Sequence, residues 1–275
     1  MYRDYSKIML KPKTLSLSHE KNILKEFGSS DVVHMRGERL GSYLAIFTGI
    51  DFDSLTTIRY ENILELDSKR KVLALYRDNV RPSSYRKTGD NLILSRCVPL
   101  FYFLVKRLEK RYEELLNKYG SDAQFLRIVC AGNDYITPAN PDDVAHDARS
   151  FLFSTVPTEE EKENFELLME YLSEKGNLID MKDHTFLIKR TYATHLHNLD
   201  MSNTDIEYIL GLRSYEGDSW EHISRKLEML HDYFYYHPYN AAFKGEEYCI
   251  ESTHQAKCAP DLLKAIKAIY RAYEM

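Results

Sequence analysis

The spacing of apolar residues changes twice along the chain, and this constrains the fold more than any other feature. Apolar residues of 36–47 recur at helical spacing and share one face. Short strand-like runs follow near residues 62–98, and helical spacing returns from residue 99 onward. We therefore expect an α+β fold that is mainly α-helical, with one small antiparallel β-sheet between two helical regions.

The expected sheet and its flanks are set by local turn and cap signals. Gly49 is expected to end helix 36–47, and Asp53 or Ser54 to cap the short helix after it. About three strands are expected from the runs 63–66, 72–76, 92–94 and 97–98. Further helices are expected over 99–119, 141–152, 158–175, 185–198, 203–210, 219–236 and 261–274. Residues 1–35 are interpreted as a lead-in and 246–275 as a C-terminal tail with a helix.

The composition bounds the class of protein. No apolar run approaches the roughly 20 residues that span a bilayer, and no secretory signal begins the chain, so no membrane is expected as a partner. The four cysteines show no metal-binding spacing, so we expect no metal, no other cofactor and a cytoplasmic location. The net charge of -5 lowers the expectation of DNA binding, because phosphate-binding proteins usually carry a basic excess.

Several short motifs occur in order along residues 35–240. They are 48–55 (TGIDFDSL) with 58–63 (IRYENI), 86–90 (RKTGD), 98–100 (VPL), 189–196 (KRTYATHL), 209–212 (ILGL) and 235–237 (YYH). Their order and distances resemble the catalytic domain of tyrosine recombinases, the phage-integrase family. The resemblance implies an integrase-like domain over 36–245. It also implies duplex DNA as the partner.

The resemblance further implies a set of catalytic roles. In this family a tyrosine hydroxyl attacks a DNA phosphodiester, two arginines clamp the charged transition state, and a lysine and a histidine move protons. The first arginine position is Asp51 here, the histidine position is Phe186, and the histidine of the later L-G-H motif is Leu212. None of these three side chains can supply the expected charge or proton transfer.

Four other positions keep part of the expected chemistry. Lys189 stands at the second arginine, where it keeps the charge and loses the planar fork, and Arg190 follows about 100° around the helix. Lys87 occupies the hairpin position of the general acid, and a surface turn lysine explains it equally well. Tyr235 is the nearest match to the nucleophile, although a packed aromatic residue explains it better.

The loss of the first arginine is the most costly departure from the family. One charge contact at about 4 Å is worth about 4 kcal/mol at an effective dielectric constant near 20. Replacing the arginine by Asp51 reverses its sign, so up to roughly 8 kcal/mol of transition-state stabilisation is lost. That loss corresponds to about five to six decades in rate. The sequence therefore favours a protein that is impaired or inactive in DNA cleavage.

Three functions remain open from the sequence. The first is an integrase-like DNA-binding protein, with a basic stretch around the hairpin formed by Arg77, Arg81, Arg86, Lys87 and Arg96. The second is an active site-specific recombinase whose clamp uses Arg36, Arg39 or Arg190. The third is a protein-interaction module that keeps only the fold and forms a homo-oligomer through the helix expected over 261–274.

Overall fold

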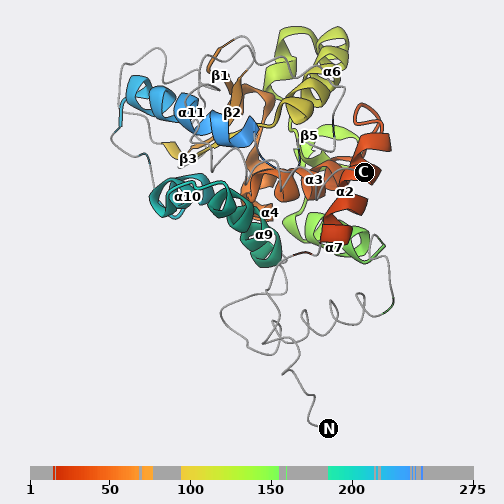
Figure 1. Cartoon of the computed structure of the whole chain (residues 1–275). Coiled ribbons are helices and arrows are strands. Elements are labelled where there is room, and N and C mark those ends of the chain that lie inside the picture. Colours follow the sequence, from red (N-terminus) through yellow and green to blue (C-terminus); the bar gives the residue numbers. More distant parts are fainter. Residues whose placement is uncertain are drawn as a thin grey trace.

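Helices flank a small sheet near residues 62–98, as the hydrophobic pattern predicts, and a second β-hairpin follows over residues 130–138 (Figure 1). This computed structural model describes residue 15, residues 17–67, 70–76, 94–154, 159, 185–213, 215, 218–235, and residues 237, 239 and 243. Its elements are α2 (Leu17–Ser29), α3 (Gly37–Thr48), α4 (Phe52–Thr57), η1 (Tyr60–Asn62), β1 (Ile63–Glu65), β2 (Lys71–Tyr76), β3 (Leu94–Pro99), α6 (Tyr102–Tyr119), η3 (Gly120–Phe125), β4 (Cys130–Ala131), β5 (Asp134–Pro138), α7 (Pro141–Ser154), α9 (Thr185–Asn198), α10 (Asn203–Leu210) and α11 (Trp220–Tyr235).

The small antiparallel sheet is confirmed. Its strand order is β1-β2-β3, with Leu73 of β2 opposite Ile63 on one side and Val98 on the other. The hairpin formed by β4 and β5 was not expected, because neither strand shows a clear alternation of apolar and polar residues. The mainly helical α+β class is therefore correct, and the strand content was underestimated.

The sheet separates two hydrophobic clusters, because side chains of a strand point alternately to its two faces. Leu73 and Leu75 face the main core, which also contains α3 and α6. Val72 and Ala74 face a smaller cluster with Ile223 and other residues of α11. Figure 1 shows α11 lying across the sheet. The amphipathic pattern of 219–236 thus covers the outer face of the sheet.

Helix α3 is the central element of the main core. Eleven of its residues are buried, as its largely apolar sequence requires. It contacts α4, α7, α9 and β4. The lead-in packs on it too, because Phe27 of α2 lies edge-on to Phe47 of α3 with ring centroids 4.9 Å apart. Helix α2 therefore shares a core with the region interpreted as the domain.

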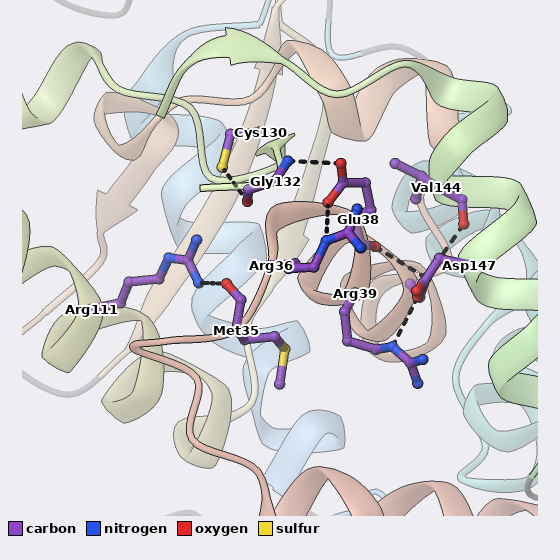
Figure 2. A network of polar contacts seen from close by, with 10 residues as sticks. Met35, Arg36, Glu38, Arg39, Arg111, Cys130, Gly132, Val144 and Asp147 are labelled. Carbon is purple, nitrogen blue, oxygen red and sulfur yellow. Dashed lines mark hydrogen bonds and ion pairs between the residues drawn. The ribbon is translucent and has the colours of Figure 1, made fainter. Parts of the chain in front are cut away.

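A polar network fixes the N-terminal end of α3 (Figure 2). The Gly37 amide donates to the Gly132 carbonyl over 2.8 Å, and the Gly132 amide donates to the Glu38 carboxylate over 2.7 Å. One turn along, Asp147 of α7 accepts from Arg39 over 3.0 Å and from Ser42 over 2.9 Å. These bonds hold α3 between the β4–β5 turn and α7.

The start of α4 corrects one local expectation. The cap is Asp51, not Asp53 or Ser54, because its carboxylate accepts from the Ser54 amide over 2.8 Å. Gly49 ends α3 in the left-handed conformation with φ 62°, as expected. The helix expected over 158–175, apart from residue 159, and the helix expected over 261–274 lie outside the described residues.

Candidate functional site

Three segments that carry the recombinase-like motifs meet at the C-terminal end of α3. Gly49 turns the chain sharply, so that Asp51 follows the helix end and caps α4. Lys189 of α9 reaches this turn, and its Nζ lies 3.7 Å from Asp51 Oδ2. The C-terminal end of α10 closes the group at Ile209–Gly211. We refer to this group of residues as the α3–α9–α10 junction.

The charged pair of the junction is open to solvent. The side chains of Lys189 and Asp51 are 32% and 36% exposed. Burial raises the pKa of Asp51, but the bonds from Ser54 and the charges of Lys189 and Arg96 outweigh it and hold the pKa below its usual value. Asp51 is therefore ionised at neutral pH, and its charge cancels that of Lys189.

Arg96 of β3 lies inside the junction. It is 4% exposed, its Nη2 donates to the Thr48 carbonyl over 3.0 Å, and its Nε donates to the Ile209 carbonyl. Burial lowers the pKa of Arg96 to about 10, although Tyr192 and Asp51 act in the opposite direction. Arg96 thus fastens the ends of α3 and α10 to the sheet. Its side chain is not presented to a phosphate at the surface, contrary to the expectation for the basic stretch.

Two close approaches explain the glycines of the junction. Gly211 follows α10 with φ 76°, and a Cβ there would lie 2.9 Å from Arg96 Cδ. A Cβ at Gly49 would lie 3.0 Å from Cδ1 of Tyr192, a fully buried residue of α9. Burial raises the pKa of Tyr192, so this tyrosine stays neutral. Both glycines therefore allow α9 and β3 to approach the helix ends.

The remaining expected site residues fall into two groups. Leu212 is described and is 73% exposed just beyond α10, so its apolar side chain faces solvent. The backbones of Phe186, Arg190 and Tyr235 lie in α9 and α11, and their side chains are outside the described part of the chain. Four residues of the hairpin lie wholly outside it, namely Arg77, Arg81, Arg86 and Lys87.

The arginines of the alternative clamp lie at the opposite end of α3. Arg36 pairs with Glu38 over 3.4 Å, and Arg39 contacts Glu26 and Asp147 over 3.3 and 3.0 Å. Helix α3 has 12 residues, which corresponds to a length of about 18 Å. Neither arginine therefore reaches the junction.

Three features of the junction and its surroundings were missed at the level of sequence. Arg96 was interpreted as a surface residue, yet strand alternation places it on the same face as the buried Val98. The packing of Tyr192 on Gly49 joins positions far apart in sequence, which no local pattern indicates. The pairing of His195 with Glu20 over 2.7 Å is of the same kind.

The geometry limits the chemistry of the junction. One ammonium faces one carboxylate, and the nearby guanidinium is already bonded to two carbonyl groups. The side chains described at the junction include no pair of arginines that could clamp the extra negative charge of a phosphoryl-transfer transition state. Among the residues that the structure describes, no cluster of three or more histidine, cysteine, aspartate or glutamate side chains could hold a metal ion.

Comparisons of the chain with models of protein families, with curated proteins and with solved structures gave no match. Within the described residues, no helix is both long enough and apolar enough to cross a membrane.

Proposed function

We propose that the chain binds duplex DNA through an integrase-like domain and does not cleave it. The proposal is supported by the meeting of Asp51, Lys189 and Gly211 at one junction. The resemblance to tyrosine recombinases expects these three motif positions to share one site. Residues 51 and 189 are more than 130 positions apart in the sequence, so no local pattern brings them together. Their contact therefore supports the resemblance.

The ion pair between Asp51 and Lys189 is the observation that carries the proposal. An exposed ion pair contributes only about 0–1 kcal/mol, so a DNA phosphate can compete with Asp51 for the ammonium of Lys189. The same pair opposes catalysis, because Asp51 repels the phosphate that an arginine would clamp. The charges of Asp51 and Lys189 together therefore account for DNA binding and for the absence of cleavage.

The active-recombinase alternative loses support from the geometry. It needs Arg36, Arg39 or Arg190 at the clamp, and the first two of these bind carboxylates at the far end of α3. Of these three arginines, Arg190 is the one that lies on α9, the helix that carries Lys189.

A mobility-shift titration tests DNA binding. We expect the protein to shift a duplex of about 30 base pairs in about 50 mM salt, and to lose about 40-fold in affinity at about 200 mM if about three phosphates are contacted. Lys189→Gln should weaken binding about threefold to tenfold and reduce the salt dependence by about one phosphate contact. The absence of a shift at low salt would contradict DNA binding and favour the interaction module.

The matched control is Lys226→Gln. Lys226 pairs with Asp205 over 3.1 Å, and its side chain is 27% exposed, close to the value for Lys189. It lies on α11 and contacts α10, outside the junction. Equal losses from the two variants would show that the net charge, rather than the junction, determines affinity.

A nicked suicide substrate tests the absence of cleavage. We expect no covalent protein–DNA adduct from the unmodified chain, because the junction lacks the clamp for the transition state. An adduct that disappears in Tyr235→Phe would refute this half of the proposal and establish an active recombinase.

A further inference from the structure

A pair of histidines, of which His237 is fully buried and His195 is partly buried, joins α9 to the residue that lies two positions after α11. His195 lies one turn beyond Tyr192 on α9, and its Nε2 lies 2.7 Å from Glu20 Oε2 on α2. The ring of His237 lies edge-on to the ring of His195, with ring centroids 5.1 Å apart. His237 follows the end of α11 by two residues. The pair therefore contacts three parts of the chain that are distant in sequence.

The hydrogen bonds of His237 define its protonation state. The side chain is fully buried, and its Nδ1 accepts from the Tyr239 amide over 3.3 Å. Nδ1 therefore carries no proton, and the proton of the neutral ring is on Nε2. Nε2 is buried and has no hydrogen-bond partner among the described residues. His237 is thus held as a neutral imidazole with one specific tautomer.

The groups around His237 oppose its protonation. Ring contacts come from Phe101 at the start of α6, Phe234 of α11, Tyr192 of α9 and Tyr239, and none of these side chains carries a negative charge at neutral pH. The titratable neighbour is His195, whose own partner is the carboxylate of Glu20. Burial lowers the pKa of His237 well below its usual value, and His195 lowers it further.

The residues beyond His237 depend on this docking. The ring of Tyr239 packs edge-on against Phe47 of α3, with centroids 5.7 Å apart. Phe243 stacks on Phe103 of α6 at 4.1 Å. Protonation of His237 would place a hydrogen on Nδ1, remove the acceptor for the Tyr239 amide and leave a charge in an apolar site. Every one of these changes favours release of Tyr239 and Phe243.

We propose that His237 is a proton-controlled clasp, which docks Tyr239 and Phe243 against α3, α6 and α9 while its ring is neutral and releases them when the ring is protonated. Helix α11 ends at Tyr235, so release also removes the anchor next to the candidate nucleophile. The clasp depends only on contacts within the chain, and its test requires no DNA. Its failure would therefore leave the proposed DNA binding untouched.

Hydrogen exchange of the Tyr239 amide measures the opening of the clasp. The open state takes up a proton with an ordinary histidine pKa near 6.5, whereas the docked state does not. The opening equilibrium should therefore rise about tenfold between about pH 7.5 and about pH 5.5, after correction for the intrinsic exchange rate. The Leu44 amide, within α3, reports global unfolding in the same sample and should exchange more slowly throughout.

Two variants separate the clasp from general acid sensitivity. His237→Phe keeps an aromatic ring and removes both the titrating group and the acceptor of the Tyr239 amide. This amide should therefore be less protected than in the unmodified chain, and its protection should become independent of pH. His222→Phe changes an exposed histidine of α11 and should keep the tenfold dependence. A Tyr239 amide that opens equally at both pH values in the unmodified chain would overturn the proposal.

The ring signals of His237 provide a second measurement on the unmodified chain, which remains informative if His237→Phe does not fold. We expect the docked form to show a neutral ring with the proton on Nε2 down to about pH 5.5. A ring that titrates near its ordinary pKa of about 6.5 while the Tyr239 amide stays protected would contradict the clasp.

Discussion

The two ends of α3 use charged residues in different ways. At the N-terminal end, Glu38 is nearly fully buried and binds the Gly132 amide, and Arg39 and Asp147 form a close pair over 3.0 Å (Figure 2). At the C-terminal end, Asp51 and Lys189 are about one-third exposed and lie 3.7 Å apart. Charged side chains reach solvent at both ends, because Arg36 and Arg39 are 72% and 30% exposed. The N-terminal end has a buried carboxylate and the shorter ion pair, whereas the ion pair at the C-terminal end is more widely spaced.

The buried arginines next to the two ends show the same difference. Arg111 of α6 donates to the carbonyl groups of Val32 and Met35, each over 2.7 Å, and so fixes the turn before α3. Arg96 fixes the far end in the same way, but Asp51 lies close enough to influence its pKa. Both arginines are structural. Of the two, Arg96 also acts on the charge of Asp51 in the ion pair with Lys189.

The largest expected effect on stability is at the N-terminal end of α3. A Cβ at Gly37 would lie 2.2 Å from the Cys130 carbonyl oxygen and 2.4 Å from the Cys130 amide nitrogen, both backbone atoms. Gly37→Ala should therefore force α3 away from β4 and lower the free energy of unfolding by about 3 kcal/mol or more, as measured by urea denaturation. Gly28→Ala is the control, because a Cβ at this position of α2 would lie at an ordinary contact distance of 3.6 Å from Phe243 Cε1 and should cost little. Equal losses would contradict the tight contact.

A smaller effect on stability is expected at the C-terminal end of α3, where Arg96 is bound. Arg96→Met keeps most of the buried stem and removes both donors, so the carbonyl groups of Thr48 and Ile209 lose their partner. We expect a loss of about 2–3 kcal/mol in the free energy of unfolding. Arg107→Met should cost less, because the carbonyl groups that Arg107 binds are partly open to water. If Arg96→Met folds and binds DNA more weakly than the unmodified chain, this result would support the junction as the DNA-binding site.

The elements of the fold were largely predictable, because their signals are local. The helix expected over 185–198 has the same bounds as α9, and the one over 36–47 differs from α3 by one residue at each end. The cap at Asp51 was missed, since Asp53 and Ser54 are equally good cap residues in sequence. The choice between them depends on where Gly49 turns the chain.

The site was predictable only in its outline. The motif order indicated that residues 51 and 189 share a site, and the two side chains are indeed paired. The burial of Arg96 and the anchoring of His237 were not predictable, because each depends on several elements brought together by the fold. Whether Lys87 and Tyr235 point to the junction stays a prediction.

The DNA affinity of Asp51→Asn is the most direct test of the claim that the C-terminal end of α3 binds phosphate. Asparagine also caps helices well, so the free energy of unfolding should change by less than about 0.5 kcal/mol. Removal of the carboxylate frees Lys189, and we expect the affinity for duplex DNA at about 50 mM salt to rise about threefold to tenfold. Glu221→Gln removes the same charge from an exposed pair with Arg225 and should leave the affinity nearly unchanged. An unchanged or lower affinity in Asp51→Asn, or an equal rise in Glu221→Gln, would contradict the account.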